Sequence, residues 1–191
     1  MAHRISKMAW LVLPVLLAGL VLSLPGVLSA QAPTKVTEVA ITGNRSINTD
    51  TIMNAIKLKP GDDFSDQAVE KDKASIMSLG YFSAVTVHKD QTPDGVKITY
   101  EVTENPKITG IKIVGSAPLS ADQVTAVMKT KPGQVLNTAT LNQDIEAIQE
   151  LYKDKKHIAY VTEEIGVDPQ TGLLTVPILV HRVESVEITG N

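Results

Sequence analysis

A duplicated segment of about 72 residues limits the folds open to this chain more than any other feature. The segment VTEVAITGN begins at Val36, KITGIKIVGS at Lys107 and VESVEITGN at Val183. A Lys-Pro-Gly triplet recurs with nearly the same spacing, at 59–61 and at 131–133. Since these matches keep one order and one offset, the sequence predicts two copies of one supersecondary unit and the opening strand of a third copy.

Each copy reads as strand, helix, helix, strand, strand. The opening segments 36–42 and 108–114 alternate apolar and polar residues, which is typical of a strand with one buried face. The spacing of Ser120 and Gln123 predicts a capping box at the start of a helix. We expect the Lys-Pro-Gly triplets to end the first helix of each copy, because proline blocks continuation and glycine accepts the turn. Asp72 and Asp144 are also about one repeat apart.

The second helix and the closing strands differ between the copies. Gly80 should end the helix in the first copy, whereas the corresponding part of the second copy reads Lys156-His157-Ile158, so we expect a longer helix there. The segment 96–103 alternates apolar and polar residues, which predicts a sheet with one buried and one solvated face. Pro177 falls within the final strand of the second copy and predicts a bulge or a broken pairing.

The composition excludes several classes of site. The chain has no cysteine, so it carries no disulfide framework, thiolate metal site or cysteine nucleophile. Its four histidines are isolated, and no catalytic or nucleotide-binding motif is present. A net charge of −3 argues against nucleic acid as a partner. We therefore predict a protein that is not an enzyme and needs no cofactor and no metal.

The first thirty residues have the order of a secretory signal peptide. Arg4 and Lys7 precede an almost entirely apolar run, Pro25-Gly26 interrupts it, and small residues follow up to Ala30. We predict a signal peptide over 1–30 with cleavage after Ala30, although Ala32 also fits the small-residue pattern. The alternative is an uncleaved transmembrane anchor, because the apolar run is nearly long enough to span a bilayer. Either alternative exports the rest of the chain.

The repeated motifs resemble the POTRA (polypeptide-transport-associated) domains of outer-membrane assembly factors of the BamA family. The resemblance covers essentially the whole chain after the signal segment. It rests on ITGNRSI (41–47), LKPGDDFS (58–65), LGYFSAVTV (79–87) and VTENPKITGIKIVG (102–115), which follow the order of the family's motifs. The resemblance implies an α+β fold of tandem POTRA domains, each β-α-α-β-β, with a three-stranded mixed sheet covered on one face by two helices. The domains would span 31–105 and 106–182, and 183–191 would open a truncated third domain.

The resemblance also implies how such a chain works. In the family, the second strand of each unit lies at a sheet edge, where unpaired backbone groups can accept an incoming strand. The chain would then be the substrate-binding scaffold at the periplasmic face of the outer membrane of a diderm bacterium. Its partners would be unfolded outer-membrane proteins and accessory assembly subunits. The expected partner-binding residues are Tyr81, Phe82, Ser83, Ala84, Val85, Thr86, Val87, His88 and Lys89, and Ile158, Ala159, Tyr160, Val161, Thr162 and Glu163.

Two other classes of protein share this kind of unit. A two-partner secretion transporter carries two POTRA units before a barrel, and the third opening strand at Val183 argues against it. An FtsQ-like bitopic cell-division protein usually has a single unit behind an uncleaved anchor, which the tandem repeat disfavours. Since 191 residues leave no room for a membrane barrel, we expect a fragment of a larger factor, associated with the membrane only through a downstream barrel that this chain lacks.

Overall fold

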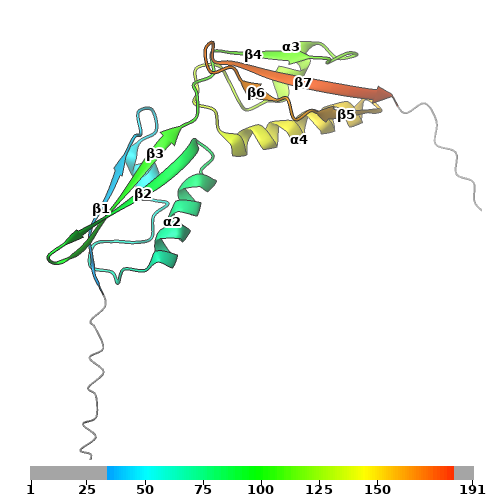
Figure 1. The fold of residues 1–191 in the computed structure, drawn as a ribbon. Helices are drawn as coiled ribbons and strands as arrows, with labels where there is room; N and C mark the ends of the chain where they lie inside the picture. Colours follow the sequence, from blue (N-terminus) through cyan, green and yellow to red (C-terminus); the bar gives the residue numbers. More distant parts are fainter. Residues whose placement is uncertain (1–33, 183–191) are drawn as a thin grey trace, which may run out of the picture. The chain divides into compact units, whose positions relative to one another are not determined.

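The computed structural model describes residues 34–182, which form two successive α+β repeats (Figure 1). The predicted signal peptide over 1–30, its cleavage after Ala30 and the predicted opening strand over 183–191 lie outside the described residues. The repeat read from the sequence is therefore present as two units with separate hydrophobic cores.

The first repeat is built on a three-stranded mixed sheet. It consists of β1 (Val36–Thr42), α1 (Thr49–Met53), α2 (Asp66–Ser78), β2 (Phe82–Thr92) and β3 (Gly95–Glu104). The strand order is β1-β3-β2, with β1 parallel and β2 antiparallel to β3. The third strand is central and the second strand forms an edge, which is the position that the family resemblance implied for the second strand.

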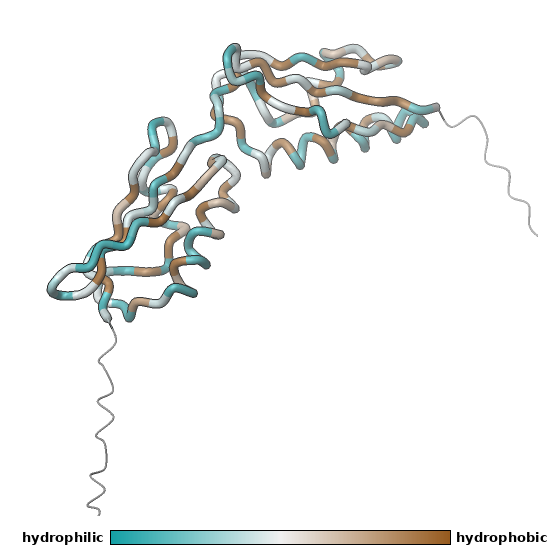
Figure 2. The backbone as a smooth tube through the Cα atoms, viewed as in Figure 1, coloured by the Kyte–Doolittle hydropathy of each residue, from teal (hydrophilic) through white to brown (hydrophobic). Residues whose placement is uncertain are grey.

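The core of the first repeat lies between one face of the sheet and the two helices. Every second residue of β3 is buried, while the residues between them are half-buried or exposed. Figure 2 shows the same alternation of apolar and polar residues along the strands. The predicted sheet with one buried face is confirmed. The buried members of the core include Val96, Ile98, Tyr100 and Val102 of β3, Ile52 of α1, and Val69 and Ile76 of α2.

The second repeat has the same order of elements with one addition. Its strand order is β4-β7-β5, and a two-residue strand, β6, also pairs with β7. Its long helix has 17 residues, against 13 in α2, which confirms the predicted longer helix. The elements are β4 (Gly110–Val114), α3 (Ala121–Val127), α4 (Thr138–Asp154), β5 (His157–Val161), β6 (Gly166–Val167) and β7 (Leu173–Arg182).

Pro177 interrupts the pairing on one side of β7. Pairing with β5 ends at Val161 and resumes in β6 at Gly166, whereas β4 stays in register through Val114. The backbone N–H of Thr162 donates to the carbonyl oxygen of Pro177 at 3.1 Å. Since the N–H and C=O of one strand residue point to the same side, the N–H that proline lacks would face β5 and β6. The predicted broken pairing is confirmed, and it is confined to this side.

The Lys-Pro-Gly triplets do not end the first helices, which corrects the sequence prediction. α1 ends at Met53 and α3 ends at Val127, several residues before the triplets at 59–61 and 131–133. The triplets form turns that follow an extended stretch. The helices are shorter than expected because the chain that leaves each of them bonds to an aspartate on the second helix.

Asp72 and Asp144 are the two aspartates that hold these extended stretches. Each carboxylate is 1% exposed and accepts two backbone N–H groups. The donors to Asp72 are residues 57 and 58, at 2.9 and 3.0 Å, and the donors to Asp144 are residues 129 and 130, at 2.6 and 2.9 Å. The recurring aspartate in the sequence therefore marks a buried link between the connecting segment and the second helix.

Candidate functional site

The longest free sheet edge in the described residues is β2. It pairs with β3 from Phe82 to Thr92, with one irregularity between Phe82 and Ala84. No described strand pairs with its other side. A strand in this position leaves a row of backbone N–H and C=O groups unpaired along its outer side.

The side chains of β2 divide between the core and the solvent. Phe82 is 3% exposed and Val85 is 6% exposed, so these two side chains belong to the core and could offer a partner strand only their backbone. Tyr81 precedes the strand and packs edge-on against Phe82, with ring centroids 6.5 Å apart. What the predicted segment offers a partner is mainly its backbone, together with its exposed side chains. These are Ser83, Ala84, Thr86, His88 and Lys89, with Val87 partly buried.

His88 and Lys89 of β2 both contact carboxylates within the repeat. His88 Nε2 lies 2.7 Å from Glu101 Oε2 of the neighbouring strand. Lys89 Nζ lies 2.5 Å from Asp66 Oδ1 at the start of α2 and 5.7 Å from the centre of the Phe64 ring. These two side chains are therefore engaged by their neighbours, and the backbone supplies the continuous row of unpaired groups along this edge.

β5 is the corresponding edge of the second repeat, and it is much shorter. It has five residues against eleven in β2. Ala159 is buried, while Ile158 and Tyr160 are exposed. Thr162 and Glu163 lie beyond the end of the strand at Val161, which corrects the expectation that they belong to it. Pro177 explains the early end, because it removes the ladder donor that the next pair would need.

An exposed apolar face on the second sheet was missed by the sequence reasoning. Ile158, Tyr160, Leu179 and Val114 are each at least 42% exposed. Tyr160 stacks edge-on with His181, with ring centroids 6.2 Å apart. The sequence did carry a sign of this face. In β5 and β7 the residues that point away from the core are also largely apolar, whereas those of β3 are polar.

The two repeats are joined by hydrogen bonds that centre on Gly80 and Asn105. The Asn105 side-chain amide donates to the carbonyl oxygens of Gly80, at 2.9 Å, and Leu136, at 3.0 Å. The side chain of Asn137 donates to Leu79 O at 2.8 Å, and the backbone N–H of Thr138 donates to Gly80 O at 2.9 Å. The glycine turn that precedes β2 is thereby bonded to the start of α4.

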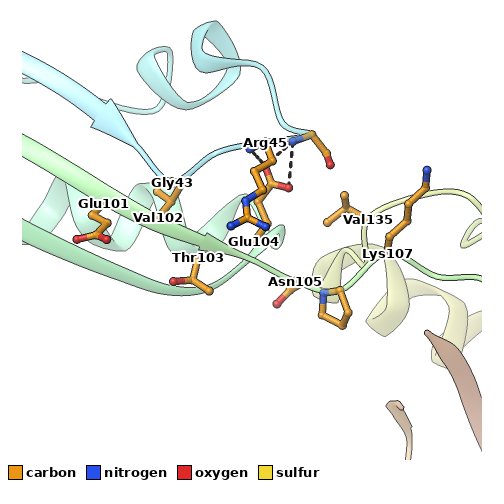
Figure 3. A pocket seen from close by; sticks show the side chains of 11 residues that line it. Gly43, Arg45, Glu101, Val102, Thr103, Glu104, Asn105, Lys107 and Val135 are labelled. Atoms are coloured by element: carbon orange, nitrogen blue, oxygen red, sulfur yellow. Dashed lines mark hydrogen bonds between the residues drawn. The ribbon is translucent and has the colours of Figure 1, made fainter. Parts of the chain in front are cut away.

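Glu104 closes the loop that follows β1. Its carboxylate accepts the backbone N–H groups of Arg45, Ser46 and Ile47 at 2.7 to 3.1 Å, two of which Figure 3 marks with dashed lines. Partial burial by itself raises the pKa of Glu104, but the three donors outweigh it, so the pKa lies below its ordinary value. A carboxylate fixed in this way stays ionised at neutral pH.

Within residues 34–182, no group of His, Asp and Glu side chains is arranged to hold a metal ion. No helix in this part of the chain is both long and apolar enough to cross a membrane. The features that could bind a partner are the free edges, the apolar sheet face and the surface around Glu104.

The sequence matches a family model twice, once in each repeat. The model is POTRA, described as a surface antigen variable number repeat, and it matches residues 34–105 and 106–181. The outer membrane protein assembly factor BamA of Nitratidesulfovibrio vulgaris (strain Hildenborough) is 34% identical over 161 residues, which cover 81% of this chain and 20% of that protein. BamA of Neisseria meningitidis serogroup B is 27% identical over 126 residues, which cover 64% of this chain and 15% of that protein. The chain therefore spans a fifth or less of the length of these curated relatives.

Two solved structures with a similar fold are Omp85 segments. The N-terminal domain of Omp85 from Thermosynechococcus elongatus superposes with a TM-score of 0.69 at 26% identity, covering 78% of this chain and 63% of that one. The POTRA1-2 segment of Omp85 from Anabaena gives a TM-score of 0.64 at 23% identity, and the match covers 79% of this chain and 98% of that one. The second likeness speaks for the fold alone.

Proposed function

The chain belongs to the POTRA family, and we propose that it is the periplasmic scaffold region of an outer-membrane protein assembly factor. The relatives with curated names are assembly factors of the outer membrane, and each is much longer than this chain. On this proposal the chain is exported and works at the periplasmic face of the outer membrane. It contributes binding and positioning to a larger machine and no catalysis of its own.

The observation that carries the proposal is the free edge of β2. A strand of eleven residues is paired on one side only, and its apolar side chains Phe82 and Val85 are turned into the core. A partner strand added here would be held by backbone hydrogen bonds, which do not depend on the partner's sequence. This suits the capture of unfolded β-barrel proteins and accessory subunits that share few residues.

We further propose that β2 is the main acceptor and that β5 is secondary. Strand addition gains backbone hydrogen bonds in proportion to the length of the paired edge. The break at Pro177 limits β5 to five residues, whereas β2 offers eleven. The two edges therefore differ about twofold in the number of residues that they can pair.

The test is a titration of the isotope-labelled chain with a peptide of alternating apolar and polar residues that ends in an aromatic residue, as outer-membrane strands do. We expect the amide shifts to be largest along residues 82–92. The matched control is the same peptide N-methylated at every residue of its central segment, so that neither of its edges can donate hydrogen bonds there.

The control peptide should lose most of its affinity, because only backbone pairing is removed. Equal binding of the methylated and unmethylated peptides would contradict strand addition. Shifts confined to α2 and α4 would contradict the assignment of the edge.

A further inference from the structure

A cleft lies beside the loop that Glu104 closes. Two cavities of about 480 and 500 Å³ adjoin there and share three lining residues, Ser46, Lys107 and Val135. We call the combined space the junction cleft, since its walls come from the end of the first repeat and the start of the second (Figure 3). Each cavity is in the size range of clefts that bind small ligands.

Three cations line the junction cleft without a carboxylate partner in the described part of the chain. They are Arg45, Lys107 and Lys129, and no acidic oxygen of residues 34–182 lies within 4.0 Å of their charged nitrogens. Lys129 Nζ donates instead to the neutral side chain of Gln143 at 3.0 Å. These side chains keep donors available for an incoming anion.

The acidic residues that line the same cleft are directed elsewhere. The carboxylate of Glu104 is occupied by three backbone N–H groups of the loop, as described above. Glu101 bonds to His88 at 2.7 Å. Three cations against these two carboxylates leave the cleft with a small excess of positive charge, although the chain as a whole has a net charge of −3.

The walls between the cations are partly apolar. Ile47, Tyr81 and Val135 line the cleft and are each partly exposed. A small inorganic anion would use the cations and leave these walls uncovered. A peptide with apolar residues between carboxylates would contact both kinds of surface, and burial of the apolar groups would add to the attraction of the charges.

We propose that the junction cleft binds an acidic, partly apolar segment of a partner polypeptide. The carboxylates of the segment contact Arg45 and Lys107, and its apolar side chains lie against Val135 and Ile47. This site is separate from the edge of β2, and the proposal does not depend on strand addition. A partner could occupy the cleft while β2 stays free.

The probe is a fluorescein-labelled hexapeptide of alternating glutamate and leucine, titrated with the full chain and followed by anisotropy. Arg45→Gln and Lys107→Gln should each weaken binding about fivefold, which is the effect of removing one largely exposed ion pair. The matched control is Lys155→Gln, an exposed lysine that does not line the cleft, and it should leave the affinity unchanged. Circular dichroism checks that each variant is folded.

Three outcomes would overturn the proposal. The first is an equal loss of affinity in the Lys155→Gln control. The second is equally tight binding of a hexapeptide in which glutamine replaces glutamate. The third is no binding of the acidic peptide, whether or not inorganic phosphate or vesicles of phosphatidylglycerol bind the chain. If the acidic peptide does not bind but the strand peptide still shifts the amides of β2, the proposed function is unaffected.

Discussion

At the scale of single residues, Glu104 shows how one side chain distinguishes two otherwise similar repeats. Gly43 lies against Val102 O, where an added Cβ would sit 2.1 Å away, and Gly115 lies in the same way against Ile178 O. This correspondence places Val180 of the second repeat at the position of Glu104. The second repeat therefore has no carboxylate to close its loop, and the difference could not be seen in the repeated motifs alone.

We predict that Glu104→Gln lowers the free energy of unfolding by about 1 kcal/mol at neutral pH, because the charge-assisted hydrogen bonds to the loop weaken in a partly exposed site. The pKa of Glu104 is lower in the folded state, so its stabilisation is present above the unfolded value of about 4.5 and is lost as the pH falls through the folded value. Urea unfolding of the chain and the variant across this range measures the difference.

The control for this prediction is Glu101→Gln, which removes an exposed carboxylate of β3 that contacts His88. A stability difference between Glu104→Gln and the unsubstituted chain that stays constant from neutral pH to below pH of about 3 would contradict the assignment.

At the scale of elements, the order of strands and helices followed from periodicity, and the ends of the elements did not. The alternation in β3 and the stripe of α4 gave the correct element types, because one face of each is buried. The early ends of α1 and α3 depend on the buried carboxylates of Asp72 and Asp144, which belong to another helix. The edge positions of β2 and β5 followed from the family resemblance, but the short length of β5 depends on which side of β7 Pro177 faces.

We predict that Asp72→Ala and Asp144→Ala each lower the free energy of unfolding by about 2–4 kcal/mol, because two backbone N–H groups lose their acceptor in or near the core. Each change should speed hydrogen exchange in its own repeat more than in the other repeat. Residue-resolved hydrogen exchange measures this, with Asp66→Ala, an exposed partner of Lys89, as the control. Equal loosening of both repeats by either change would contradict the prediction.

At the scale of the whole molecule, the described repeats belong to one compact unit and are bonded to each other through the turn at Gly80. The sequence contains this link only as the Gly80-Tyr81-Phe82 motif and the Asn105-Pro106 linker. Neither motif indicates that Asn105 and Asn137 bond across the junction, because the partners are backbone carbonyls that any residue carries.

We predict that Asn105→Ala speeds hydrogen exchange at the amides of Leu136 and Thr138, because two carbonyl oxygens at the junction lose their donor. The change should lower the free energy of unfolding by about 1–3 kcal/mol. The control is Asn44→Ala, whose side chain bonds only within its own loop. Unchanged protection at both amides would show that Asn105 does not hold the junction.

The proposed addition of a partner strand along the free edge of β2 can be tested by thiol cross-linking. The chain has no cysteine, so a single introduced thiol is unique. Ala84→Cys, Thr86→Cys and His88→Cys place thiols on exposed positions of β2, and Glu38→Cys places one on β1, the opposite edge of the same sheet. Each variant is mixed with strand peptides that carry one cysteine at successive positions.

We expect disulfide formation at the three β2 positions, with the best peptide partner moving by two residues for each step of two along the strand. The Glu38→Cys variant should give little product. Equal yields at Glu38 and on β2, or yields on β2 that do not depend on the position of the peptide cysteine, would contradict the proposed strand addition.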